Sequence, residues 1–206
     1  MQTLVLFGGT FDPPHLGHLA LLTLTRELIC PDKVILSVSR NPLKAGTTAT
    51  DQQRFEMAQQ LAEELNATGN CFEVSDWELK QNSPSYTIET LQHWQAQYPS
   101  ARWLLAVGED NYRIFHRWKS PEKILEIVEL LVFSRQVQNI SRESMQAFAN
   151  AKVHFIQLDL SISLSELRQR LSDPVQRQQA MRKVPSVIAR YIEANKLYSA
   201  SASVTE

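Results

Sequence analysis

The chain contains few of the residues that mark several common protein classes. Its 206 residues include two cysteines, Cys30 and Cys71, and they do not form a Cys-x-x-Cys pair. This excludes a disulfide framework and is typical of a protein of the reducing cytoplasm. No apolar stretch approaches the roughly 20 residues that a membrane-spanning helix needs. The first apolar run stops at Phe7 without a preceding basic region, so we expect neither a signal peptide nor a membrane association.

The sequence also has no excess of one charge. Lys and Arg number 21 against 22 Asp and Glu, which gives a formal net charge of −1. This excludes a globally basic nucleic-acid binder, and we expect no nucleic-acid partner. The length and the ordinary hydrophobic content of 43% predict a single globular domain at 1–198 with a frayed polar tail at 199–206. The oligomeric state is left open, and a homo-oligomer is compatible with the sequence.

Glycine is scarce as well, but its distribution is uneven. Three of the six glycines lie in FGGTFDPPHLGH, residues 7–18. The stretch follows Leu4–Phe7, an apolar run typical of a strand buried on both faces. One interpretation is a tight turn between a strand and a helix. The more specific one is a phosphate site, because glycine lets backbone approach a ligand and a helix N-terminus presents free N–H groups.

Two histidines in this stretch favour the phosphate site. His15 and His18 are three residues apart, so at the start of a helix they share one face. There they could donate hydrogen bonds to a phosphate whose charge grows during a reaction. A histidine pair at this spacing could also be half of a zinc site, but no third ligand is apparent. The stretch does not match G-x-G-x-x-G, so hydride transfer with a dinucleotide is poorly supported.

Along the chain, apolar runs alternate with segments of helical periodicity. This alternation predicts an α/β fold with a Rossmann-like, doubly wound parallel sheet and C-terminal helices. The expected strands are 4–7, 34–38, 71–74, 102–107, 130–133 and 153–158. The expected helices contain Leu21 to Leu28, begin at a capping box of Thr50 and Gln53, contain Ile88 to Trp94, and cover 121–127, 164–171 and 185–195.

In such a sheet the ligand crevice lies beyond the carboxyl ends of the strands. The residues that follow the predicted strands should therefore meet at one place. They are polar or small, as a nucleotide site requires. They are Gly8-Gly9-Thr10, Arg40 to Lys44, Gly108-Glu109-Asp110 and Ser134-Arg135.

Two motifs in this order resemble a known superfamily. Gly8 to Pro13 followed by His15-Leu16-Gly17-His18 is similar to the signature of the H-x-G-H nucleotidyltransferases. Ile162 to Arg168, ISLSELR, resembles the I-S-S-T-x-I-R signature of the adenylyltransferases within that superfamily.

Three further segments narrow the resemblance to the bacterial nicotinate-nucleotide adenylyltransferases. Ser85-Tyr86-Thr87 with Thr90-Leu91 is similar to their S-Y-T-x-x-T-L segment. Gly108 to Asn111 with Trp118 resembles their G-x-D segment and the tryptophan after it. The stretch from Val184 to Tyr198 resembles their closing pattern. The resemblance covers residues 4–198.

The resemblance implies an enzyme that transfers the adenylyl group of ATP to nicotinate mononucleotide and releases pyrophosphate. Magnesium would bridge the phosphate oxygens, and the chain shows no dedicated carboxylate cage, which suits an ion held by the substrate. Such a reaction needs positioning and charge neutralisation rather than a covalent nucleophile. Two alternatives stay open: nicotinamide mononucleotide as acceptor, and a regulatory module that binds ATP without turnover.

The resemblance also assigns residues to roles. The implied catalytic residues are His15, His18, Lys44 and Arg168. The implied ATP-binding residues are Gly8, Gly9, Thr10, Phe11, His15, His18, Gly108, Asp110, Arg135, Ser163, Ser165 and Arg168. The implied acceptor-binding residues are Lys44, Tyr86, Thr87 and Trp118, where an aromatic face could stack on an electron-poor pyridinium.

Each assignment has a simpler interpretation. Trp118 could be a packing residue, Tyr86 could merely begin a helix, Arg168 could pair with a helix-surface acid such as Glu166, and Lys44 could be a solvated loop residue. His93, His116 and His154 are expected to have no functional role.

The chain departs from the family pattern at three positions. Leu43 replaces a loop histidine, which puts a role for an imidazole there in doubt. Leu164 replaces a serine of the second signature, so either a phosphate hydrogen bond is lost or this position faces the core. Glu109 stands where the family often has alanine or serine, and solvent exposure is the one explanation that the sequence suggests.

Overall fold

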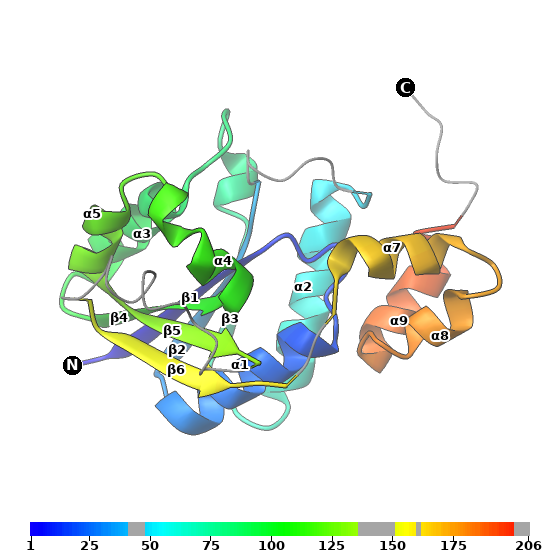
Figure 1. Cartoon of the computed structure of the whole chain (residues 1–206), viewed down its shortest axis with the longest axis horizontal. Coiled ribbons are helices and arrows are strands. Elements are labelled where there is room, and N and C mark those ends of the chain that lie inside the picture. Colours follow the sequence, from blue (N-terminus) through cyan, green and yellow to red (C-terminus); the bar gives the residue numbers. More distant parts are fainter. Residues whose placement is uncertain (41–47, 136–150, 160–161, 200–206) are drawn as a thin grey trace.

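A central parallel sheet organises the protein (Figure 1). The computed structural model describes residues 1–40, 48–135, 151–159 and 162–199. Its sheet has six strands in the order β3-β2-β1-β4-β5-β6, and every neighbouring pair is parallel. This confirms the predicted doubly wound α/β class. The strands are β1 Thr3–Gly9, β2 Lys33–Val38, β3 Phe72–Ser75, β4 Arg102–Gly108, β5 Val128–Ser134 and β6 Val153–Gln157.

Helices cover both faces of the sheet, and alternate residues of each strand supply the two cores. Val5 and Phe7 pack with α1 and α2, whereas Leu4 and Leu6 pack with α3 and α5. The C-terminal helices join the first core and lie beside α2 at one end of the molecule (Figure 1). The α-helices of the described residues are α1 Leu16–Ile29, α2 Asp51–Asn66, α3 Thr87–Gln97, α4 Glu109–Arg113, α5 Pro121–Ile127, α7 Leu164–Ser172, α8 Arg177–Met181 and α9 Ser186–Ala194.

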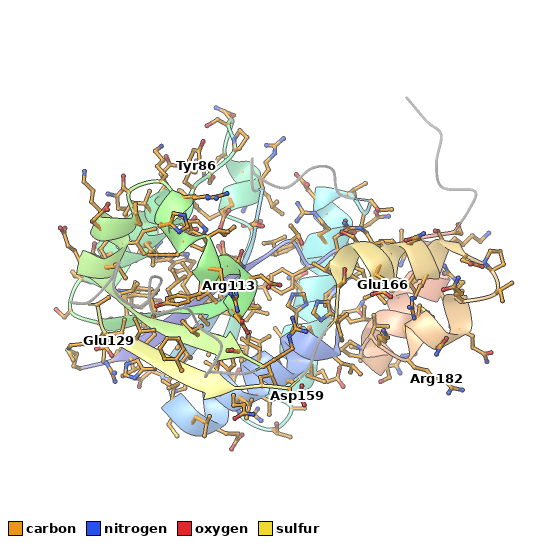
Figure 2. The ribbon with its side chains drawn as sticks, in the orientation of Figure 1. Tyr86, Arg113, Glu129, Asp159, Glu166 and Arg182 are labelled. Carbon is orange, nitrogen blue, oxygen red and sulfur yellow. The ribbon has the colours of Figure 1, made fainter. Side chains whose placement is uncertain are left out.

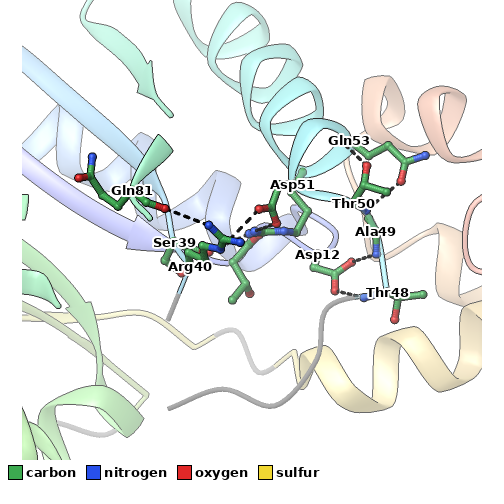
Figure 3. Close-up of polar contacts among 11 residues, drawn as sticks. Asp12, Ser39, Arg40, Thr48, Ala49, Thr50, Asp51, Gln53 and Gln81 are labelled. Atoms are coloured by element: carbon green, nitrogen blue, oxygen red, sulfur yellow. Dashed lines mark hydrogen bonds and ion pairs between the residues drawn. The ribbon is translucent and has the colours of Figure 1, made fainter. Parts of the chain in front are cut away.

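Local sequence signals fix several helix ends. The Thr50 hydroxyl accepts the Gln53 N–H, and the Gln53 side chain accepts the Thr50 N–H, so the predicted capping box is confirmed (Figure 3). Helix α1 ends at Cys30 in the left-handed conformation, and Pro121 begins α5 as predicted. None of the described helices has the length and apolar character that a bilayer crossing requires.

Short elements were missed by the sequence prediction. Helices α4 and α8 are five residues each, and the 3₁₀ segments Glu78–Lys80 and Phe115–Arg117 are three. None is long enough to show helical periodicity. The described residues from 162 to 199 therefore contain three helices, α7, α8 and α9, rather than the two expected.

Candidate active site

The first turn after β1 places two imidazoles against each other. His15 is the N-cap of α1, and its Nδ1 accepts the backbone N–H of His18 at 3.3 Å. The Nδ1 of His18 accepts the backbone N–H of His15 at 3.2 Å. The rings stack with centroids 3.8 Å apart. This reciprocal arrangement is a capping box made from two histidines, which satisfies two of the N–H groups that a helix start leaves without partners.

The cap also defines the protonation of both rings. Because each Nδ1 accepts a hydrogen bond, the neutral imidazole carries its proton on Nε2. Burial lowers the pKa of His15 to about 4, so this ring is neutral near pH 7. The helix start therefore offers an uncharged Nε2–H donor from His15 and a second imidazole from His18, next to backbone N–H groups and the positive end of the helix dipole.

The glycines of the motif differ in what they allow. A Cβ on Gly17 would lie 2.9 Å from the His15 ring, so the stacked pair requires glycine there. A Cβ on Gly9 would meet the ring of Phe11 at 3.0 Å. Among the described residues, no atom lies within 4 Å of a Cβ built on Gly8 or Gly108. These last two therefore leave open space where a ligand can approach backbone.

The larger of two cavities lies beside the histidines and has a volume of about 540 Å³. It gathers residues from the carboxyl ends of β1, β4 and β5 and from the start of α7, as the strand order predicts. Its lining includes nine of the twelve predicted ATP-binding residues: Gly8, Gly9, Thr10, His15, His18, Gly108, Asp110, Arg135 and Ser163.

Three predicted ATP-binding residues lie outside that lining. Phe11 is fully buried, and the centroid of its ring lies 5.2 Å from that of His18, so Phe11 packs against this imidazole. Ser165 is exposed on the first turn of α7. Arg168 is on the next turn, where its Nη1 donates to the backbone oxygen of Asp12 at 3.1 Å and lies 3.5 Å from Asp12 Oδ2.

The second cavity, of about 140 Å³, lies on the α3 side of the same sheet edge. Three of the four predicted acceptor-binding residues, Tyr86, Thr87 and Trp118, line it together, and the fourth, Lys44, lies outside the described residues. The Trp118 ring also packs on Phe115, 5.1 Å between centroids, so its packing role and its cavity position coexist. The two cavities share Phe7, Gly8 and Asn111, and therefore adjoin at the end of β1.

Tyr86 is held at the mouth of the second cavity by two charged residues. Glu89 accepts its backbone N–H at 3.0 Å, and Lys119 Nζ lies 4.5 Å from the centre of its ring. Lys119 also donates to Glu89 at 2.7 Å. Figure 2 shows Tyr86 on the α3 side of the sheet, far from Glu166 on α7. Tyr86 is therefore both the N-cap of α3 and part of the cavity wall.

The second cavity has a buried hydroxyl, that of Ser85, in its wall. The Ser85 side chain is 5% exposed, and its hydroxyl has no hydrogen-bond partner among the described residues. A buried carboxyl lies in the same wall: Glu78 accepts the Ser37 hydroxyl at 2.7 Å, and burial raises its pKa. Both side chains offer polar atoms to a ligand in an otherwise largely apolar cavity.

The departures from the family pattern now have a structural account, with one exception. Leu164 is half-buried and lines the larger cavity, so it presents an apolar surface there. Glu109 is not simply solvated, which corrects the sequence interpretation: its side chain is 15% exposed and accepts the Ser134 hydroxyl at 2.7 Å. That hydrogen bond and Arg113 lower the pKa of Glu109. Leu43 and Lys44 lie outside the described residues.

The sequence analysis missed residues whose partners are distant along the chain. Arg54 is 1% exposed, and its Nη1 donates to the carbonyls of Thr10 at 2.7 Å and Ser39 at 2.9 Å, joining the ends of β1 and β2. Asn111, Ser85 and Glu78 were also given no role. The signal for Arg54 was its position on the core face of α2, where an arginine needs buried acceptors.

The described residues contain no group of three or more His, Cys, Asp or Glu side chains that could hold a metal ion. Asp12, in the turn that precedes the histidines, is fully buried and already accepts four donors. A divalent ion in this site would therefore need ligands from a bound substrate.

Comparisons with known proteins identify the family. Residues 6–188 match the cytidylyltransferase-like family. A protein of Chloroherpeton thalassium named as a probable nicotinate-nucleotide adenylyltransferase is 48% identical over 198 residues, which are 96% of this chain and 98% of the relative. One of the same name from Chlorobium phaeovibrioides is 44% identical, over 93% of this chain and 96% of the relative.

Solved structures agree on the fold. The nicotinic acid mononucleotide adenylyltransferase of Plasmodium falciparum, complexed with NaAD, superposes with a TM-score of 0.80 over 96% of this chain and 98% of its own, at 19% identity. Its complex with APC gives a TM-score of 0.77. With the family match and the relatives above, the chain belongs to the cytidylyltransferase-like family and, within it, to the nicotinate-nucleotide adenylyltransferases.

Proposed function

We propose that this protein transfers the adenylyl group of ATP to nicotinate mononucleotide, forming deamido-NAD and releasing pyrophosphate. The observation that carries the proposal is the pair of adjoining cavities. One contains the histidine cap and glycine backbone, the other contains Tyr86, Thr87 and Trp118, and they meet at Gly8. Two substrates bound in this way have their reacting groups held near one another, which lowers the entropic cost of transfer.

In the proposed reaction the larger cavity holds ATP. The Nε2–H groups of His15 and His18 donate to the phosphates and stabilise the charge that develops as the α-phosphorus is attacked. Ser163 at the start of α7 adds a hydroxyl, and Arg168 grips the triphosphate. The family resemblance assigns Lys44 the role of a point charge that neutralises a phosphate. Magnesium arrives with ATP as part of the substrate, because the described residues offer no cage for it.

The smaller cavity holds the pyridine ring of the acceptor. Tyr86 and Trp118 supply aromatic faces for an electron-poor ring, and Thr87 at the start of α3 supplies a hydroxyl and a free backbone N–H. Lys119 lines the cavity and lies over the Tyr86 ring, with its charge paired to Glu89. N–H donors at the start of α3 favour a carboxylate over a carboxamide, which supports the acid as acceptor.

The test is pyrophosphate release from ATP and magnesium with three acceptors at equal concentration: nicotinate mononucleotide, nicotinamide mononucleotide and phosphopantetheine. We expect turnover with the acid mononucleotide to exceed turnover with the other two. A clear preference for the amide would overturn the choice of acceptor. ATP binding without pyrophosphate release from any acceptor would instead identify a regulatory module.

A further inference from the structure

Asp12 is the meeting point of three segments that are far apart in the sequence. Its side chain is fully buried, and it lies in the turn between β1 and α1. It accepts the backbone N–H of Thr48 at 2.8 Å and of Ala49 at 3.1 Å (Figure 3). From the C-terminal end, the hydroxyl of Tyr198 donates to its Oδ1 at 2.6 Å. The third segment is α7, from which Arg168 contacts both its backbone oxygen and Oδ2.

The position of Tyr198 is itself fixed by an arginine. Arg177 on α8 donates to the carbonyl of Tyr198 at 2.9 Å and to the carbonyl of Leu197 at 3.0 Å. The Tyr198 side chain is 2% exposed, and burial together with the charge of Asp12 raises the pKa of its hydroxyl. The hydroxyl is therefore protonated near neutral pH and donates to Asp12.

These contacts form a chain that ends on the arginine of the second signature. A buried carboxylate is oriented by its donors, and Tyr198 shares Oδ1 of Asp12 with the Ala49 N–H, so loss of the hydroxyl leaves one lone pair of that oxygen without a donor. Asp12 holds Arg168 through Nη1 alone. A guanidinium has five N–H donors, so the contact orients the group and leaves most of its fork for an anion.

We propose that Tyr198 and Asp12 are positioning residues for Arg168, so that the C-terminal segment sets the orientation of the arginine toward the ATP phosphates. The inference rests on the proposed function, in which Arg168 grips the triphosphate. It gives a role to two residues, at opposite ends of the chain, that the reaction itself does not use.

The first test compares two Tyr→Phe variants. Y198F removes the hydroxyl that reaches Asp12, and Y191F removes a hydroxyl that also donates to a carboxylate, that of Glu56, on the adjoining face of α9 and α2. We expect Y198F to weaken the binding of magnesium and ATP about tenfold in a calorimetric titration, the usual scale for a hydrogen bond to a charged group. The KM for the mononucleotide should stay unchanged, and Y191F should leave both quantities unchanged.

The second test asks whether Tyr198 acts through Arg168. If it does, Y198F will have no further effect on ATP affinity in an R168A background, so that the two changes are strongly non-additive. Additive effects, or equal loss of ATP affinity in Y198F and Y191F, would overturn the proposal. A lower melting temperature with unchanged ATP affinity would show a purely structural role and would overturn it too.

A third variant tests the proposal if Y198F does not fold. D12N keeps the size of the side chain but removes its charge and one acceptor, so it should weaken ATP binding in an Arg168-dependent way if Y198F does not fold. ATP binding is measured without turnover, so it tests the coupling of Tyr198 to Arg168 independently of the reaction. Failure of the wild-type protein to release pyrophosphate would refute the proposed reaction and would leave the test of this coupling intact.

Discussion

At the scale of single residues, the Ser85 hydroxyl is a buried polar atom that lacks a partner among the described residues. Leaving such an atom unpaired costs about 1–3 kcal/mol of stability, so native proteins contain few of them and each calls for an explanation. Ser85 lines the cavity proposed for the pyridine ring. We infer that a substrate atom supplies the missing partner, so that the stability cost is recovered as binding.

This gives the Ser85→Ala variant an unusual expected result. Removing an unpaired buried hydroxyl should leave the free energy of unfolding unchanged or raise it by about 1 kcal/mol. The same change should raise the KM for the mononucleotide about fivefold to tenfold and leave the KM for ATP unchanged. Denaturant unfolding and steady-state kinetics measure the two effects.

Ser37 provides the control for this variant. Its hydroxyl is equally buried but donates to Glu78 at 2.7 Å, and the residue does not line the cavity. Ser37→Ala should therefore lower the free energy of unfolding by about 1–2 kcal/mol. An S85A protein that is destabilised as much as S37A, with an unaltered KM for the mononucleotide, would contradict the role of Ser85.

His15 predicts a specific dependence of stability on pH. Burial lowers its pKa from 6.5 to about 4 in the folded protein, so between these values the unfolded chain binds a proton that the folded chain does not. Unfolding is therefore favoured as the pH falls through this window, and stability is complete above it. The shift corresponds to about 3 kcal/mol, lost progressively between about pH 6.5 and pH 4.

The measurement compares the wild type with His15→Asn. Asparagine keeps a side-chain acceptor for the helix cap but has no titratable group. Other acidic groups titrate in both proteins, so the difference between their unfolding free energies should isolate His15 and shrink as the pH falls from 7 to 4. A difference that does not vary with pH would show that His15 is not shielded from protonation in the fold.

At the scale of elements, the two imidazoles at the start of α1 both cap the helix and take part in the proposed reaction. The Nδ1 atoms cap the helix, which leaves the Nε2–H groups as the donors that the proposed reaction uses. A capping box is usually built from a Ser or Thr with a Glu or Gln three residues later. Replacing His18, the residue at that later position, should therefore separate helix stability from catalysis, depending on which side chain takes its place.

His18→Gln and His18→Ala test this separation. Gln restores a side-chain acceptor for the His15 N–H, so we expect the stability of H18Q to stay near that of the wild type, whereas H18A should lose about 1 kcal/mol. Both should lose about 10²–10³ in kcat, because the imidazole donor is absent. Thermal unfolding and pyrophosphate release measure the two effects, and near-normal turnover of either variant would refute the role of His18.

Elements and site residues differed in how far the sequence predicted them. The strands followed from buried apolar runs such as Leu4–Phe7, and the helix ends from local signals such as the Thr50 cap. The histidine pair was predicted to share a face because its spacing is local. Asp12 and Arg54 were missed because their partners lie up to 186 and 44 residues away. No local pattern carries information about such contacts, which depend on the packing of the whole chain.

At the scale of the whole molecule, the strand order explains why the two cavities meet at the end of β1. Strands β1 and β4 are neighbours at the point where the connections turn from one half of the sheet to the other. The helices that follow them lie on opposite faces, α1 on one and α4 on the other. A crevice opens at such a point. Gly8 at the end of β1 lies in its middle and borders both cavities.

Gly8→Ala should therefore act on function alone. Its Cβ would meet no described atom within 4 Å, and its φ is not in the left-handed region, so the variant should fold and gain up to about 1 kcal/mol from a less flexible unfolded chain. The methyl group would occupy the space between the two substrates. We expect kcat to fall at least about tenfold, because transfer depends on the approach of the reacting groups.

Gly108→Ala is the matched control for this change. Its Cβ also has open space, but Gly108 borders the larger cavity alone. It should raise the KM for ATP while the KM for the mononucleotide stays constant, whereas Gly8→Ala should alter the kinetics of both substrates. If Gly8→Ala turned over normally with both, the substrates would not meet over the end of β1, and the two cavities could not form one catalytic site.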